Sequence, residues 1–163
     1  MPIYMKVPGV VGTGTGKHKG WIILDSCQLG VNRHISSPTG GSEARNPAVS
    51  EIVVTKNLDM ATTNLCKMSL WGEPRNVTID FVKDTKKVTN QAAPYVSIEL
   101  ENTLITSYSV SGAGGGSNVR TMETLSLNFT KITYSTTPSS ASTDPDAVKG
   151  KALWNLAVGT SAK

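Results

Sequence analysis

Alternation of apolar and polar residues is the dominant pattern along the chain. Between Val96 and Val110, the even-numbered positions are largely apolar and the odd-numbered positions are largely polar. The apolar set is Val96, Ile98, Leu100, Leu104, Tyr108 and Val110. A period of two places successive side chains on opposite faces of a β-strand. Because the run is longer than a typical strand of about five or six residues, it predicts one long strand, or two in line, with a bend or bulge near Asn102.

The segment from about residue 120 to residue 135 changes its alternation partway. Residues that share the first face are Leu125, Leu127 and Phe129, and those of opposite parity are Ile132 and Tyr134. A change of parity inside one run predicts a bulge, or a strand that leaves one sheet and joins another. The stretch before it reads SGAGGGSN, at residues 111–118. We expect a flexible hairpin loop there, because the stretch is too long and too rich in glycine for a two-residue turn.

Shorter patterns predict further strands and one helix. The expected strands are residues 3–7, 20–29, 49–56, 77–83 and 151–158. The helix has Thr62 as N-cap, a partial apolar face of Leu65, Met68 and Leu70, and an end set by Gly72 and Pro74. Loops are expected at residues 36–48 and 137–150. The sequence thus predicts one domain over residues 1–163, mainly β, built as an antiparallel two-sheet barrel or sandwich with one short α-helix and a flexible segment at about 137–150.

Composition and charge narrow the function classes. The 163 residues are 38% hydrophobic and 17% charged, which fits one compact domain rich in strands and turns. The net charge of +4 arises from scattered basic residues with no block, so we expect a solvated surface and no nucleic-acid partner. The N-terminus lacks the apolar region of a signal peptide, and no apolar run reaches the ~18 residues of a membrane span. We therefore expect synthesis in the cytosol and no membrane insertion.

A glycine-rich stretch, GVVGTGTGKHKGW at residues 9–21, raises the question of phosphate binding. A P-loop needs a glycine five positions before its Gly-Lys pair, where this chain has Val11, and a hydroxyl residue after the lysine, where it has His18. A dinucleotide fingerprint would require a third glycine at Lys19. No helical pattern follows to aim an N-terminus at an anion. The spacing therefore predicts a turn.

No other motif points to an enzyme. The two histidines, His18 and His34, and the two cysteines, Cys27 and Cys66, have no metal-ligand spacing. The cysteines lie within apolar strand or helix patterns, which favours buried thiols, although a disulfide stays open. Glu99 and Glu101 share one strand face, as solvated charges commonly do. We expect no catalytic residue, no metal and no cofactor, which leaves a binding module or a subunit of an assembly.

Six segments, in this order, closely resemble the Hcp family, the haemolysin-coregulated tube proteins of bacterial type VI secretion. They are HKGWI (residues 18–22), SSPTGGSEAR (36–45), VSEIVVTKNLD (49–59), VTIDFVK (77–83), LENTLITSYSVSG (100–112) and ETLSLNFTKI (123–132). The resemblance runs from about Ile3 to Tyr134, with a weaker echo at Leu153 to Asn155. No single segment is specific, but the ordered set is.

The resemblance implies a small two-sheet β-barrel with a flanking helix, six copies of which form a ring with a central channel. Rings stack into a tube inside a contractile sheath and are capped by a VgrG-like spike protein. Contraction drives the tube out of the cell without a signal peptide, and small effector proteins travel in the lumen of some family members. Expected partners are therefore other copies of the chain, sheath and spike proteins, and effectors. The alternative left open is a monomeric β-barrel that serves as a binding or adaptor module.

Two loops are the expected places of ring–ring and subunit–subunit contact, because they project beyond the predicted strands. The residues predicted to take part are Ser36, Gly40, Gly41, Glu43, Arg45, Gly112, Gly114, Gly115 and Arg120. Arg45 and Arg120 can pair with carboxylates of a neighbouring copy. The competing interpretation is that glycine-rich loops are only mobile tips.

Overall fold

The computed structural model describes residues 1–33, 35–36, 43–44, 47–82, 94–112, 121–137, 150–157 and 159. Its elements in chain order are β1 (Ile3–Lys6), the 3-10 turn η1 (Gly16–His18), β2 (Ile22–Leu24), β3 (Ser26–Gln28), β4 (Val31–Asn32), β5 (Ile35–Ser36), β6 (Glu43–Ala44), β7 (Ala48–Val49), β8 (Ile52–Asn57), α1 (Thr62–Trp71), β9 (Arg75–Val82), β10 (Pro94–Ser111), β11 (Met122–Asn128), β12 (Lys131–Thr136) and β13 (Gly150–Asn155). The mainly β class with one short helix is confirmed. Most of the segment expected to be flexible, at about 137–150, lies outside the described residues.

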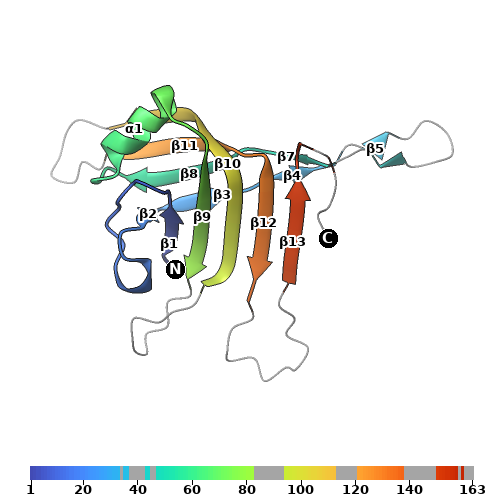
Figure 1. Ribbon diagram of the computed structural model, residues 1–163, viewed down its shortest axis with the longest axis horizontal. Coiled ribbons are helices and arrows are strands. Elements are labelled where there is room, and N and C mark those ends of the chain that lie inside the picture. Colours follow the sequence, from blue (N-terminus) through green and yellow to red (C-terminus); the bar gives the residue numbers. More distant parts are fainter. Residues whose placement is uncertain are drawn as a thin grey trace, which may run out of the picture.

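Two antiparallel sheets share the long strand β10 (Figure 1). One half of β10 pairs with β9 and β12, and these extend to β1 and β2 on one side and to β13 on the other. Its other half pairs with β11, which continues to β8 and β3. In Figure 1 the strands of the two sheets cross each other, and β10 curves from one into the other. Such a corner, made by a strand that changes sheets, lets both sheets enclose one core.

The corner in β10 lies where the alternation pattern placed it. Asn102 has a φ of 51°, which is rare outside glycine, and the pairing register shifts between Leu100 and Thr103. The shift also reverses which positions face inward, so the predicted apolar face is wrong at Leu104. Thr103 and Ile105 are buried there, whereas Leu104 is 41% exposed. A second register shift, between Ile105 and Ser107, returns the predicted Tyr108 to the core side, while Val110 is exposed.

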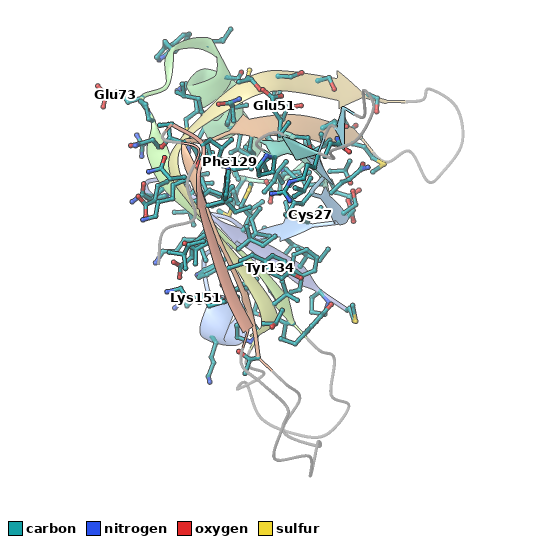
Figure 2. The ribbon with its side chains drawn as sticks, turned by 90° about the vertical axis from the view of Figure 1, so that its right-hand side faces the viewer. Cys27, Glu51, Glu73, Phe129, Tyr134 and Lys151 are labelled. Carbon is teal, nitrogen blue, oxygen red and sulfur yellow. The ribbon has the colours of Figure 1, made fainter. Side chains whose placement is uncertain are left out.

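The change of parity after β11 marks a change of sheet, as predicted. Leu125 and Leu127 are buried on β11, which pairs with the second half of β10. The chain then turns at Phe129, and β12 buries Ile132 against the first half of β10. In Figure 2, Phe129 and Tyr134 lie toward the middle of the molecule, while Glu73 and Lys151 lie at its outer edge.

The strand expected at residues 20–29 is divided in two. β2 pairs with β1, whereas β3 pairs with β8 of the other sheet, so the chain changes sheets at Asp25. The buried residues of β2 are Ile22 and Leu24, while Ile23 is 42% exposed. The inward-facing positions of β2 are therefore the even-numbered ones.

Helix α1 ends as predicted but begins differently. Its last residue is followed by Gly72, whose N–H donates to the Met68 carbonyl. Thr62 is its first residue and not its N-cap. Ala61 is the N-cap and makes no side-chain capping hydrogen bond, while the Thr62 hydroxyl donates to Glu123. The Asp59 carboxylate accepts the Ala61 N–H just before the helix. Leu65 is fully buried against the sheets, but Leu70 is 67% exposed, so its assignment to the apolar face is wrong.

The core lies between the two sheets and beneath α1. Its members are the buried apolar side chains Met5, Val7, Val10, Ile22, Leu24, Ile52, Val54, Ala61, Leu65, Val77, Ile79, Ile98, Leu100, Ile105, Leu125, Leu127, Phe129 and Ile132. Because β1, β2, β8, β9, β10, β11 and β12 all contribute to this single cluster, the surfaces described next are held on a rigid frame.

Candidate functional site

The residues that the sequence predicted for subunit contacts fall into three groups. Ser36 and Glu43 lie opposite each other where β5 pairs with β6. This short pair of strands projects away from the two large sheets (Figure 1). Gly112 is exposed directly after the end of β10. The other candidates, Gly40, Gly41, Arg45, Gly114, Gly115 and Arg120, lie outside the described residues.

The glycine-rich segment at residues 9–21 folds back on itself and contains only the three-residue turn η1. The N–H groups of Gly12 and Gly14 donate to the carbonyls of Gly20 and Trp21, each at 2.8 Å. These donors are therefore consumed within the turn and do not point at an anion. A side chain at Gly14 would collide with the carbonyl oxygens of His18 and Trp21, and Gly20 has a φ of +78°. Glycine is needed here for close packing of the backbone.

His18 fastens this turn to the outer face of the sheet. Its Nε2 lies 2.9 Å from Oδ2 of Asp80 on β9, and the Ser97 hydroxyl donates to the other oxygen of Asp80 at 2.7 Å. The imidazole stacks on the Tyr4 ring, with centroids 4.5 Å apart, and meets the Trp21 ring edge-on. With only 7% of His18 exposed, the arrangement anchors the turn. Sequence reasoning missed it because His18 and Asp80 are brought together only by the pairing of β1 with β9.

A second polar cluster, here called the buried ionic network, joins α1 to β8, β10 and β11. The ammonium of Lys56 pairs with the Glu123 carboxylate and lies 2.8 Å from Oδ1 of Asp59. The other donors to Glu123 are the hydroxyls of Thr62, at 2.9 Å, and Tyr108, at 2.5 Å. Lys56 and Glu123 are fully buried. Because each charge has several partners, the network is satisfied and fixes the start of α1 on the sheet.

The ionisation of this network follows from its contacts. Burial by itself would raise the pKa of Glu123, but hydrogen bonds from Lys56, Tyr108 and Thr62, together with the Lys56 charge, outweigh it and lower that pKa. Burial raises the pKa of Tyr108, and the hydrogen bond to Glu123 and the charge of Glu123 raise it further. The network therefore holds an ionised Glu123 and a neutral Tyr108, which is a stable structural pairing.

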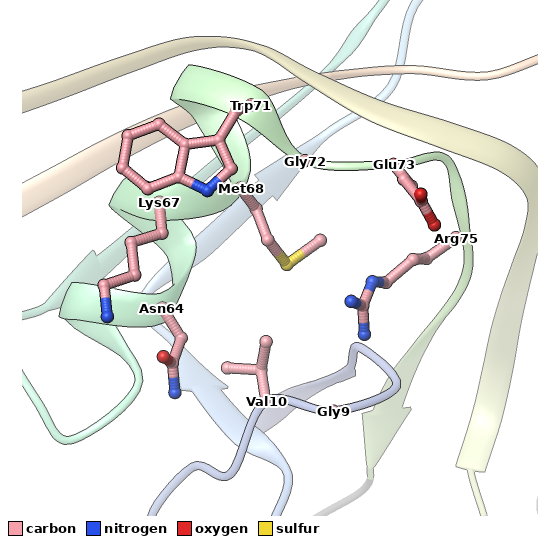
Figure 3. A pocket seen from close by; sticks show the side chains of 9 residues that line it. All are labelled: Gly9, Val10, Asn64, Lys67, Met68, Trp71, Gly72, Glu73 and Arg75. Carbon is pink, nitrogen blue, oxygen red and sulfur yellow. The ribbon is translucent and has the colours of Figure 1, made fainter.

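A groove lies under α1, between the helix and the segment that follows β1 (Figure 3). Its volume is about 330 Å³. Helix positions 64, 67, 68 and 71 form one side at the i, i+3, i+4, i+7 spacing of a single helix face. The complete lining is Gly9, Val10, Asn64, Lys67, Met68, Trp71, Gly72, Glu73 and Arg75. We call this hollow the α1 groove.

Exposed apolar side chains gather around the same helix. Trp71 is 72% exposed and Leu70 is 67% exposed, and Met60, just before the helix, is 64% exposed. Trp71 and Leu70, at the end of the helix, are large apolar groups left in water, which mark an interaction surface. The helical spacing of Asn64, Lys67 and Trp71 was the sequence signal for the groove face, whereas the sequence prediction named only a partial apolar face of Leu65, Met68 and Leu70.

A second hollow, of about 500 Å³, lies beside β12 and β13 and is lined mainly by apolar residues. Its lining residues are Leu29, Val31, Pro47, Val49, Ile132, Tyr134, Ala152, Leu153 and Trp154. Strand β13 pairs only with β12 among the described strands, so its other edge stays open next to this hollow.

In the described part of the chain, no three acidic, histidine or cysteine side chains lie close enough together to hold a metal ion. Cys27 and Cys66 are free thiols, and burial raises the pKa of Cys27 to about 11. Glu101 forms an ion pair with Lys131 at 2.7 Å. None of the helices seen in these residues is both long and apolar enough to span a membrane.

Comparison with protein families gives a match over most of the chain. The family model described as type VI secretion system effector, Hcp, matches residues 4–135. No curated protein sequence matches the chain.

Several solved structures share the fold. A structure described as a type six secretion system protein is 23% identical, with a TM-score of 0.84 and coverage of 99% of both chains. Hcp1 from Salmonella typhimurium is 17% identical, with a TM-score of 0.76 and coverage of 99% of this chain and 98% of its own. A type VI secretion system effector from Yersinia pestis is 21% identical, with a TM-score of 0.70 over 94% and 98% of the two chains.

Proposed function

Because the chain belongs to the Hcp family of type VI secretion system effectors, we propose that it is a structural tube subunit that forms hexameric rings. The rings stack into the inner tube of the secretion machine. The match of the family model over residues 4–135 carries this proposal. The shared fold of Hcp structures, over nearly the whole length of both chains, supports it.

The open edges of the sheets agree with assembly into a ring. In the described residues, β2, β3 and β13 each pair on one side only. An open edge offers unpaired N–H and C=O groups to another chain. Head-to-tail contacts between identical subunits close into a ring when the rotation between neighbours allows it. The apolar hollow beside β13 provides burial for such a contact.

The remaining steps belong to the same proposal. Sheath contraction pushes the tube and its spike out of the cell, so the subunit is secreted without a signal peptide. Small effector proteins are carried in the channel. The work is mechanical, and a buried ionic network that fastens α1 to the barrel suits a subunit that must keep its shape under load.

The test is the size and shape of the purified particle. Light scattering on a sizing column is expected to give about six times the subunit mass of 17.3 kDa, and negative-stain images are expected to show rings with an open centre. A monomer that persists at high protein concentration would contradict the proposal and favour a monomeric binding or adaptor module.

Stacking is tested separately, by charge reversal in the predicted contact loop. Arg45→Glu is expected to weaken stacking of rings into tubes while the subunit stays folded. Lys17→Glu, at an exposed position of η1, is the matched control. Tubes that form at the wild-type protein concentration with Arg45→Glu would show that Arg45 is not a stacking contact.

A further inference from the structure

The geometry points to the α1 groove as a docking site for an acidic, apolar-anchored segment of a second protein, distinct from the tube subunit itself. The inference deepens the proposed function and rests on it, since it names the chemistry of one partner of the assembled ring. It is carried by the shape of the groove, by three apolar side chains in its lining and by its charge.

The groove has a mixed lining, in which Val10, Met68 and Trp71 supply the apolar side chains. Val10 is buried beneath it, Met68 is half-buried and points into it, and Trp71 borders it with 72% of its surface exposed (Figure 3). A buried floor beside an exposed indole leaves apolar area that only a further side chain can cover.

Size restricts what the groove can take. Its volume of about 330 Å³ is at the lower end of the roughly 300–1,000 Å³ typical of small-molecule pockets. The space suits one or two anchoring side chains, and tryptophan at its border is the residue type most often dominant in protein contacts. A protein segment therefore fits this surface better than a free metabolite does.

Charge selects the kind of segment. Lys67 is exposed on the helix side and Arg75 reaches in from the start of β9, against the single carboxylate of Glu73. Neither cation belongs to an ion pair among the described residues; Arg75 donates to the Pro8 carbonyl, which leaves its other N–H groups for a ligand. Two cations beside the exposed Trp71 and the half-buried Met68 attract a segment with acidic residues around an apolar anchor.

The alternative occupant is a second copy of the chain, which ring images of the Trp71→Ala variant distinguish from an acidic partner segment.

The test uses a pair of synthetic peptides and the full chain. The probe is a helical peptide of about 16 residues, with leucine and tryptophan on one face and glutamate on the other. Its matched control has lysine in place of every glutamate. Calorimetric titration is expected to show binding of the acidic peptide only, and binding that weakens as salt is added.

Variants place the binding in the groove. Trp71→Ala and Lys67→Glu are each expected to weaken binding of the acidic peptide about tenfold or more. Lys17→Glu makes the same charge change at an exposed position of η1, outside the groove lining, and is expected to bind like the wild type. Both groove positions are exposed, so thermal unfolding is expected to confirm folded variants.

Particle images of the same samples separate this inference from the proposed function. Normal rings with no binding of the acidic peptide, or with equal binding of both peptides, would overturn the docking site alone. Binding without rings would overturn the tube proposal and leave the docking site standing. Loss of rings in the folded Trp71→Ala variant would show that the groove joins copies of the chain, which also overturns the inference.

Discussion

Lys56 and Glu123 form an ion pair across the neighbouring strands β8 and β11, and both side chains are fully buried. They are register partners, so backbone pairing alone brings them face to face. The Glu123 carboxylate also accepts hydrogen bonds from Thr62 of α1 and Tyr108 of β10. One carboxylate thus connects the helix to three strands, and loss of its partner leaves a charge in the protein interior.

Removal of one partner is predicted to be costly. Lys56→Met leaves Glu123 buried without its counter-ion, so we expect the free energy of unfolding to fall by about 3–5 kcal/mol. Urea denaturation measures it. Lys131→Met breaks the exposed pair with Glu101 and is the matched control, with an expected change of about 0–1 kcal/mol.

The double variant Lys56→Met with Glu123→Leu tests the cause. Because the Glu123 charge is also removed and only Asp59 then lacks its counter-ion, it is expected to lose less stability than Lys56→Met alone. If Lys56→Met and Lys131→Met lowered the free energy of unfolding equally, the buried ionic network would contribute no more to stability than the pair of Lys131 with Glu101.

Stability is predicted to depend on pH through Glu123. Its folded-state pKa is lowered from the ordinary value of 4.5, so the folded chain favours the charged carboxylate more than the unfolded chain does. The stabilisation from Glu123 is complete above about pH 4.5. It is lost as the pH falls through the folded-state pKa of Glu123. Glu123→Gln lacks this contribution, so the stability gap between it and the wild type is expected to narrow in acid.

Urea midpoints of the two proteins from neutral pH to about pH 3 give that gap. Other carboxylates titrate in both proteins and cancel in the difference. A gap of constant size over the whole range would contradict an ionised, stabilising Glu123.

Two glycines in loops are predicted to differ in how much stability their replacement by alanine costs. Gly14→Ala places a Cβ against the carbonyl oxygens of His18 and Trp21, which are backbone atoms and yield poorly. We expect a loss of more than about 1 kcal/mol, and faster amide exchange in residues 9–21. At Gly112 the nearest atom to an added Cβ is the Thr121 hydroxyl at 3.6 Å, an ordinary contact, so Gly112→Ala is the control.

The outcome that would contradict this prediction is equal stability of the two alanine variants. It would mean that the turn at residues 9–21 opens without cost, and that its fastening by His18 to Asp80 contributes nothing.

The strand pattern was readable from sequence because it depends on local periodicity. The long strand, its bend near Asn102 and the change of sheet after Phe129 all follow from parity in the alternation. The bend made it impossible to assign from the alternation alone which residues after Asn102 face the core. A single extra residue reverses which side chains face the core, so Leu104 was placed inside although it is exposed.

The site was less predictable, because its residues meet only through long-range pairing. Lys56 and Glu123 lie 67 residues apart, and a lysine at the end of a strand carries no mark that it is buried. Thr62 looks like a helix cap in sequence, yet its hydroxyl serves Glu123. The α1 groove is a different case. Its helix-side residues follow a helical spacing, so the sequence was enough to place them on one face of the helix. A single sequence does not distinguish an exposed tryptophan from a buried one, so the exposure of Trp71 could not be predicted.

Cys27 is predicted to react slowly with alkylating reagents. Burial raises its pKa to about 11, so at about pH 8 only about one thiol in 1,000 is the reactive thiolate. Mass spectrometry after iodoacetamide treatment of the folded protein is expected to leave Cys27 unmodified, with full modification after denaturation as the control. Rapid labelling of Cys27 in the folded state would show that β3, an edge strand, opens readily.

The last prediction concerns the corner of β10. Asn102 adopts a φ of 51°, which asparagine tolerates and β-branched residues do not, and its side-chain amide donates to the Thr130 hydroxyl at 3.2 Å. Asn102→Val is therefore expected to cost about 1–2 kcal/mol in backbone strain and to lose that hydrogen bond as well. Asn102→Gly keeps the backbone conformation and loses only the side chain, so it is expected to be the more stable of the two. Urea unfolding measures the stability of both variants. If the valine variant were as stable as the glycine variant, β10 would pass between the sheets without needing a left-handed backbone conformation at position 102.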